Sequence, residues 1–165
     1  MEPNSESTRP FLDGRRSEAN SLEEGFGFRI GRLHRILRDA WGDKIANLGL
    51  SPPQAAMLRA VCERTDSGVR ELARWTRTDA TNAKRLADYL EHLELIYSSA
   101  DPSHRQRRLL CPTEHGVKLA NEVSERSAEW NRELTEMIGA DEFRQLESLL
   151  ELVEQVLEFK YFSEL

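Results

Sequence analysis

The segment Asp79-Ala-Thr-Asn-Ala-Lys-Arg-Leu-Ala-Asp-Tyr-Leu-Glu91 decides the fold of this chain. Asp79 is a good helix N-cap, because its short carboxylate can accept hydrogen bonds from the free amides of the next turn. Apolar residues then recur at spacings of three and four, which predicts one apolar helix face, at Ala83, Leu86, Leu90 and Leu93. Outside this face, the N-terminal half of the helix carries short polar or cationic side chains. These residues are Thr81, Asn82, Lys84, Arg85 and Asp88.

A shorter helix is predicted just before this segment. Its buried side is formed by Val69, Leu72, Ala73 and Thr76, and the pair Arg77-Thr78 makes the turn. Two short helices joined by a tight turn, with the second helix polar and basic at its start, are typical of a helix-turn-helix.

A β-hairpin is predicted directly after the second helix. Leu95–Ser99 and Arg107–Cys111 are short β-prone runs, and an Asp-Pro turn with a cationic tip lies between them. A hairpin beside a helix-turn-helix is a wing. We expect Arg105 at its tip, with Arg107 and Arg108 behind it, to reach a phosphate or the floor of a minor groove.

The order and spacing of these motifs resemble those of a known family. The residues concerned are Arg70-Glu71-Leu72-Ala73, Asp79, Arg85-Leu86, Asp88, Leu90-Glu91, Asp101-Pro102, Arg105 and Thr113-Glu114-x-Gly116. They resemble the MarR family of bacterial winged-helix regulators, and the resemblance extends from about Phe26 to Leu157. The chain departs from the family pattern at Thr76-Arg77-Thr78, Glu94, Ser98, Ser99 and His104, which bears on DNA sequence preference and wing contacts.

Helices are predicted on both sides of the winged segment. A first long helix runs from about Leu22 to Asn47 and exits at Gly49, and Ser51-Pro-Pro-Gln54 starts a second one that ends near Arg64. Beyond the wing, Thr113 caps a long helix whose expected buried positions are Val117, Ala120, Val123, Trp130, Leu134 and Met137. Gly139 separates it from a last helix with a coiled-coil-like seam at Phe143, Leu146, Leu150, Val153 and Leu157.

The last helix is apolar on more than one side, because Leu149, Leu152, Val156 and Phe159 widen its seam. A terminal helix of this kind usually needs a second partner. We infer a homodimer built from the first and last helices, which the family resemblance also implies; burial of this helix within a monomer is the alternative.

The predicted fold is mainly α with a small β-hairpin wing. Residues 1–20 are predicted to be a disordered tail, since they are polar, lack periodicity and contain Pro and Gly. Residues 21–48 and 113–165 form the helical dimerisation region, and residues 49–112 form the winged helix-turn-helix DNA-binding domain.

The net charge of −6 is unevenly distributed. Residues 1–67 are balanced, residues 68–111 carry +2, and residues 112–165 carry −8. Because phosphate attraction is screened over about a Debye length, the local charge matters more than the total. The chain has no apolar run approaching the roughly 20 residues of a membrane span and no apolar signal-peptide core, so a cytoplasmic location is expected.

Enzymatic chemistry is not expected. The four histidines fall on different elements without a shared motif, and the chain has no Gly-rich phosphate loop and no nucleophile elbow. A zinc site at His104, Cys111 and His115 has no usual ligand spacing, so neither metal nor cofactor is predicted. Cys62 is most simply a small core residue, and redox sensing through Cys62 or Cys111 is a minority hypothesis.

The resemblance also implies a small, often anionic aromatic effector that binds between the dimer helices and the winged domain. Residues that could furnish such a pocket are His34, Arg38, Trp41, Met57 and Trp75.

The predicted function is a dimeric DNA-binding transcription regulator, a repressor released by a small molecule. Thr81, Asn82, Lys84 and Arg85 would lie nearest the bases and phosphates of a near-palindromic operator. The alternatives are a ligand-insensitive DNA-binding protein or activator, and a protein-interaction module that has lost DNA binding.

Overall fold

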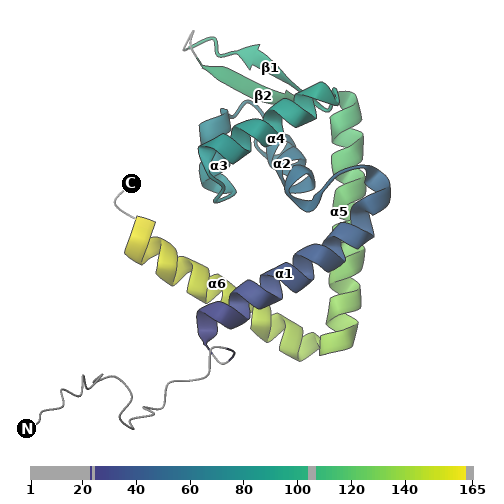
Figure 1. The fold of residues 1–165 in the computed structure, drawn as a ribbon, viewed down its shortest axis with the longest axis vertical. Coiled ribbons are helices and arrows are strands. Elements are labelled where there is room, and N and C mark those ends of the chain that lie inside the picture. The colour runs from purple at the N-terminus through teal and green to yellow at the C-terminus, as the bar shows by residue number, and fades with distance from the viewer. Residues whose placement is uncertain (1–22, 24, 104–106, 163–165) are drawn as a thin grey trace, which may run out of the picture. The chain divides into compact units, whose positions relative to one another are not determined.

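The computed structural model describes residues 23, 25–103 and 107–162, so the predicted tail at 1–20 and the wing-tip residue Arg105 lie outside the described part. Within these residues, six α-helices and a two-stranded hairpin follow one another in the order α1, α2, α3, α4, β1, β2, α5, α6 (Figure 1). The chain divides into two units at the Asp39–Ala40 junction. None of the described helices is both long enough and apolar enough to cross a membrane.

The first unit contributes the opening part of helix α1, which spans Phe26–Ile45. The helix begins four residues later than the sequence predicts among the described residues, and a 3-10 turn at Ala46–Leu48 follows it. Gly49 ends this turn with a left-handed φ of 70°, which confirms the predicted helix exit.

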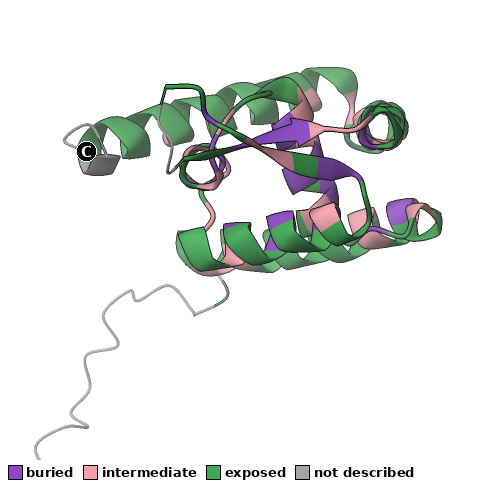
Figure 2. Ribbon diagram, turned by 90° about the horizontal axis from the view of Figure 1, so that it is seen from above, coloured by how far each residue is buried: buried purple, intermediate pink, exposed green. Residues whose placement is uncertain are grey.

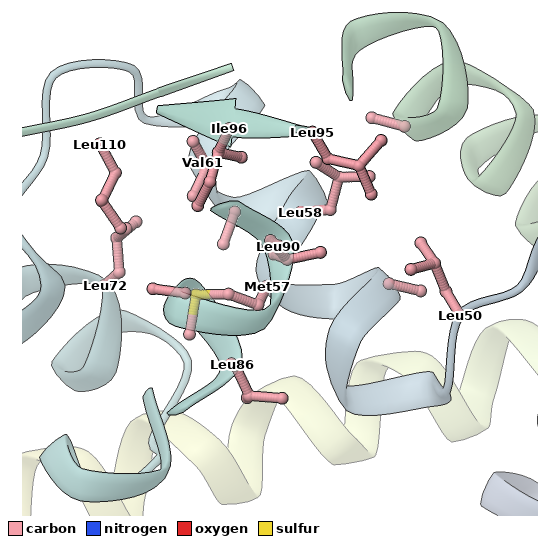
Figure 3. Packing of buried hydrophobic residues seen from close by; sticks show 14 of the residues in the cluster. Leu50, Met57, Leu58, Val61, Leu72, Leu86, Leu90, Leu95, Ile96 and Leu110 are labelled. Atoms are coloured by element: carbon pink, nitrogen blue, oxygen red, sulfur yellow. The ribbon is translucent and has the colours of Figure 1, made fainter. Parts of the chain in front are cut away.

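The core of the second unit is formed by the winged domain. Helices α2 (Pro52–Glu63), α3 (Val69–Trp75) and α4 (Ala80–His92) pack with strands β1 (Ile96–Ala100) and β2 (Arg108–Pro112) around one apolar cluster. The cluster is shown in Figure 3, where Met57 and Leu58 of α2 lie with Leu72 of α3, Leu90 of α4 and Leu110 of β2. Burial of these side chains fixes the helix-turn-helix against the wing.

Helix starts follow the predicted capping chemistry. At α2, the backbone N–H of Ser51 donates to Gln54 Oε1 at 2.8 Å. At helix α5 (Glu114–Ile138), Thr113 Oγ1 accepts from the N–H of Gly116 at 3.0 Å and donates to the carbonyl of Glu94 at 2.8 Å. Thr113 therefore ties the start of α5 to the segment that follows α4.

The two strands pair antiparallel, with Tyr97 opposite Cys111 and Ser99 opposite Leu109. Both strands begin one residue later than predicted, because the antiparallel ladder runs from the Ile96–Pro112 pair to the Ala100–Arg108 pair. Leu95 stays outside the ladder, yet it is 2% exposed and belongs to the core cluster.

Helix α5 leaves the winged domain and leads through Gly139 into helix α6, Ala140–Phe162 (Figure 1). The end of α1 packs on α5 through a stacked pair, Trp41 and Trp130, whose ring centroids lie 5.4 Å apart. An ion pair between Lys44 and Glu133 reinforces this contact. The turn of the helix-turn-helix is also tied to α6, by an ion pair between Arg77 and Glu158.

Two predictions of burial on α5 are wrong. Val117 is 40% exposed and Met137 is 72% exposed, because none of the described elements covers these two side chains. Leu93, predicted to lie on the apolar face of α4, is 37% exposed, since it is the C-cap residue where the helix has already ended.

Helix α6 has an extensive exposed apolar surface. Its side chains are mostly exposed along the length described (Figure 2), and the large apolar ones include Leu146, Leu149, Leu150, Leu152, Val156, Leu157 and Phe159. Apolar surface of this extent on one helix is typical of an interface.

Candidate nucleic-acid interface

Helix α4 buries one face and exposes the other as its sequence predicts. Asp79 caps the helix by accepting from the N–H of Asn82 at 2.8 Å. Four residues of its apolar face are buried, namely Ala83, Leu86, Ala87 and Leu90. Because this face is held in the core, the opposite face is presented to the surroundings, with Thr81, Lys84 and Arg85 exposed and Asn82 partly so.

The polar side chains of α4 are joined in two pairs. Arg85 Nη2 donates to Asn82 Oδ1 at 2.8 Å, and Lys84 Nζ donates to Asp88 Oδ2 at 2.6 Å. Both pairs are exposed ion or hydrogen-bond contacts, which contribute little to stability. They do set the orientation of the side chains before any partner binds.

The wing places Arg108 beside this helix. Arg108 is the first residue of β2 and pairs with Ala100, and its side chain is exposed. It makes no side-chain hydrogen bond or ion pair within residues 23, 25–103 and 107–162. Its guanidinium is therefore available to an external anion.

Arg107 is held by the domain itself. Its guanidinium donates to Glu71 on α3, and Nη1 lies 3.6 Å from Oδ2 of the buried Asp101 in the wing. Asp101 also accepts from the N–H of Ser103 at 2.7 Å, which shapes the turn. The link from α3 through Arg107 to Asp101 fixes the wing against the helix-turn-helix, while a DNA contact by Arg107 stays a prediction.

Glu71 connects this link to the start of α3. Its Oε2 accepts from the N–H of Gly68 at 3.0 Å as well as from Arg107. The hydrogen bond from Gly68 is the main reason why the pKa of Glu71 is lowered, and the nearby charge of Arg107 adds to it. A lowered carboxyl pKa favours the charged form in the folded state.

We expect the Glu71 contacts to make folding sensitive to acid. Because the folded-state pKa lies below the ordinary value of 4.5, the stabilisation is complete above that value and is lost as the pH falls through the lowered pKa. Glu71→Gln keeps an acceptor for Gly68 but removes the charge. Urea unfolding gives the free energy of unfolding of both proteins. On acidification below pH 4.5, this free energy should fall less in the variant than in the wild type. Equal acid sensitivity of the two proteins would contradict this.

The helix-turn-helix and wing geometry agrees with that of known regulators. No family model matches the chain. A curated relative, the HTH-type transcriptional regulator MhqR of Bacillus subtilis (strain 168), is 24% identical over 127 residues, which are 77% of this chain and 86% of that protein.

Solved structures of transcription regulators also have a similar fold. A transcriptional repressor, CouR, bound to a 23-mer DNA duplex superposes with a TM-score of 0.76 at 23% identity, covering 82% of this chain and 96% of that one. CouR from Rhodococcus jostii RHA1 bound to p-coumaroyl-CoA has a TM-score of 0.71 at 20% identity, over 88% and 98%. The reduced form of MarR from E. coli has a TM-score of 0.70 at 20% identity, over 78% and 96%.

The chain has the winged-helix fold of these regulators. This confirms the fold predicted from the sequence, a mainly α chain with a β-hairpin wing. It also places the helix-turn-helix at Val69–His92 and the wing at Ile96–Pro112.

Four of the five residues predicted for an effector pocket have other contacts. Met57 is 2% exposed and belongs to the core, and Trp41 stacks on Trp130. Trp75 is 43% exposed, and the guanidinium of Arg64 lies 4.5 Å from its ring centroid. His34 and Arg38 belong to the first unit, where Arg38 Nε lies 3.7 Å from Asp39 Oδ1. None of these contacts joins two of the five.

The two cysteines, Cys62 and Cys111, lie in different surroundings. Cys62 is partly buried on α2, and burial, followed by the charge of Glu63, raises the pKa of its thiol. A raised pKa disfavours the reactive thiolate. Cys111 lies on β2, as predicted, and is buried there, with Sγ 3.1 Å from Asp66 Oδ1 and 3.7 Å from Ser99 Oγ.

The sequence reasoning missed the link between Glu71, Arg107 and Asp101. One part of it has a local signal, because Glu71 stands three residues after Gly68, which is the spacing of a helix-capping acid. The other part joins residues 36 positions apart, and spacing alone does not indicate which arginine of the wing Glu71 selects.

Proposed function

We propose that this chain is a dimeric, sequence-specific DNA-binding transcription regulator, a repressor that a small ligand releases. The observation that carries the proposal is the exposed polar half of α4, held beside the exposed Arg108 of the wing. A helix and a wing presented in this way suit a major groove and the phosphates beside it. The similarity to CouR, a repressor solved with a DNA duplex, supports the proposal.

In this proposal, helix α6 forms the dimer interface. The apolar residues exposed along α6 would pair with the same helix and with α1 of a second copy. A two-fold axis then sets two α4 helices in successive major grooves about 34 Å apart, on a near-palindromic operator. Residues 21–48 and 113–165 would be the dimerisation region, and residues 49–112 the DNA-binding domain.

The pair of Asn82 and Arg85 suggests how bases are read. Since Asn82 Oδ1 accepts from Arg85, the amide nitrogen of Asn82 is the group left to contact a base. A donor of this kind matches an acceptor such as guanine O6 or N7 or thymine O4. Adenine requires both an acceptor and a donor from Asn. Asn82 therefore contacts adenine in this way only after its hydrogen bond with Arg85 has broken.

Release by a small ligand completes the proposal. CouR has also been solved with p-coumaroyl-CoA, which is an anion with an aromatic body. A ligand that binds the DNA-free state more tightly shifts the chain away from its operator.

A gel shift with the DNA upstream of the chain's own gene, repeated with salicylate-like compounds, tests the proposal. We expect a single retarded protein–DNA complex that persists in an excess of unrelated DNA. The complex should dissociate when the ligand is added. Retardation that the ligand leaves unchanged indicates a ligand-insensitive DNA-binding protein or an activator. Equal affinity for specific and unrelated DNA would contradict sequence-specific regulation and favour a protein-interaction module.

Arg105 provides a second test through the salt dependence of binding. We expect Arg105→Ala to weaken DNA binding and to reduce the slope of log K against log salt by about one unit for the lost phosphate contact. Fluorescence anisotropy at several salt concentrations measures this slope. Lys118→Ala on α5, which is exposed and lies outside the proposed interface, should leave it unchanged. An unaltered slope in the Arg105 variant would remove the wing tip from the interface.

A further inference from the structure

The turn before helix α4 is bound to helix α6. The guanidinium of Arg77 in this turn pairs with the carboxylate of Glu158, which lies 81 positions further along the chain. The two side chains are 50% and 60% exposed, so the Arg77–Glu158 pair is a surface contact and adds nothing to the core. Among the described elements, α6 packs mainly on α5, and the pair connects it in addition to the helix-turn-helix.

The turn around Arg77 is closely hydrogen-bonded. The N–H of Thr78 donates to the carbonyl of Ala73 at 2.9 Å, and the N–H of Arg77 donates to the carbonyl of Arg74 at 3.2 Å. Asp79 follows immediately and caps α4. Because Arg77 lies only three residues before the first residue of α4, a displacement of Arg77 also displaces the start of that helix.

The backbone of Arg77 is unusual for an arginine. Its φ is 51°, in the left-handed region that favours glycine. A glycine would form this turn without strain, but it has no side chain that could bind Glu158. A strained residue that also makes a contact with a distant helix indicates a role for its side chain.

Helix α4 is held near both of its ends. After its last residue, the carbonyl of Glu94 accepts from Thr113 Oγ1, the N-cap of α5, at 2.8 Å. Before its first residue, Arg77 binds Glu158 of α6. A contact near one end leaves a helix free to tilt, whereas contacts near both ends fix the direction of its axis.

We propose that Arg77 is a positioning residue for DNA binding, which acts through Glu158 to fix the direction of α4 relative to α5 and α6. Direction matters because a helix enters the major groove in a defined orientation. The Arg77–Glu158 pair stands by itself, whereas its effect on DNA binding rests on the proposed function. The rival role for Arg77 is a direct contact with a DNA phosphate.

The pair is tested first on the full chain without DNA, by amide hydrogen exchange in the turn that contains Thr78. Glu158→Gln removes the charge from α6, and exchange in the turn should become about two- to fivefold faster, which corresponds to one exposed ion pair. Glu154→Gln is the matched control, because Glu154 is exposed one turn earlier and forms no ion pair among the described residues. Exchange in the turn that is equal in both variants would overturn the proposal.

DNA affinity separates positioning from a phosphate contact, because the two roles predict opposite signs for Glu158→Gln. Positioning predicts binding weaker than in the Glu154→Gln control, by about four- to twentyfold in a dimer with two such pairs. A phosphate contact predicts equal or tighter binding, since Arg77 is then released from Glu158. Fluorescence anisotropy with the upstream DNA fragment measures the sign. Binding as tight as in the control, or tighter, would overturn the proposal.

Exchanging the two charges gives a second readout. Arg77→Glu alone should weaken DNA binding by about tenfold or more, because two carboxylates then face each other. Adding Glu158→Arg should recover about fivefold or more, since the reversed pair can form. The slope of log K against log salt should match the wild type, whereas each lost phosphate contact would reduce it by about one unit. No recovery in the doubly substituted chain, with an unchanged far-UV circular dichroism spectrum, would overturn the proposal.

Failure of the proposed function is distinguishable from failure of the positioning role. A wild-type chain that binds no upstream DNA, while Glu158→Gln still exchanges faster than Glu154→Gln, contradicts the proposed function and leaves the Arg77–Glu158 pair intact. A wild-type chain that binds DNA with an affinity that none of these substitutions changes overturns the positioning role alone.

Discussion

Replacing Gly116 by alanine is expected to destabilise the chain strongly. A Cβ at this position would lie 1.9 Å from the carbonyl oxygen of Leu95 and 2.9 Å from its carbonyl carbon. Both atoms belong to the backbone, so no side chain can rotate away. Overpacking in such places costs about 1 to 3 kcal/mol and sometimes more, and this contact is at the severe end. The better helix propensity of alanine returns at most about 1 kcal/mol.

The matched control is Gly42→Ala, which is also a helical glycine. A Cβ there would lie 3.7 Å from Pro52 Cγ, which is ordinary van der Waals contact. This variant should gain up to about 1 kcal/mol from helix propensity alone. Urea unfolding should therefore show opposite signs, with the Gly116 variant losing about 2 kcal/mol or more. Equal stability of the Gly116 variant and the wild type would contradict the close packing of α5 on Leu95.

Gly116 allows the start of α5 to lie close to the segment that follows α4, and this junction bears on function. Its N–H donates to Thr113 Oγ1, which in turn donates to the carbonyl of Glu94. The start of α5 is thereby bonded to the segment that follows α4. Since α5 leads to the proposed dimerisation helix, a shift at Gly116 changes how α4 is held and should weaken DNA binding along with stability.

Local features were predictable from the sequence because their causes are local. The Asp79 cap, the exit at Gly49 and the Thr113 cap each depend on one side chain or one glycine and its next few residues. The buried face of α4 follows from its spacing, apart from Leu93, which the spacing places in the stripe although the helix ends before it.

Contacts between distant segments could not be read in the same way. No local sequence pattern distinguishes the three arginines of the wing. In the structure, Arg107 binds Glu71 and Asp101, whereas Arg108 has no partner among the described residues. The difference arises from strand alternation and from the position of α3, which spacing does not indicate. The burial predicted for Met137 failed for a related reason, since a periodic face shows that a surface is apolar and leaves open what covers it.

Placing a charge on the exposed face of α6 is expected to have the largest effect on function. Leu150 is 44% exposed and lies at the centre of the apolar seam. If this face is the dimer interface, Leu150→Glu buries two carboxylates near the two-fold axis, where desolvation and mutual repulsion oppose association. We expect a monomer by size-exclusion chromatography with light scattering, and a folded chain by circular dichroism, because the winged core does not include Leu150.

DNA binding should fall with dimerisation by a calculable amount. Linking two half-site contacts converts the second into an intramolecular event and raises affinity by about 10² to 10⁴-fold. The Leu150→Glu monomer should therefore bind the operator weaker by about that factor, although its α4 and wing are unaltered. The variant should also bind a single half-site as the wild-type subunit does.

Gln145→Glu is the control, since it adds the same charge to an exposed polar position of α6. This variant should remain dimeric and keep its operator affinity, so that a loss in the Leu150 variant is assigned to the interface and not to the added charge. A Leu150→Glu chain that is still dimeric and still binds the operator tightly would place the interface elsewhere. The exposed leucines of α6 would then require another partner, and the two-fold arrangement of the α4 helices would have to be built from a different face.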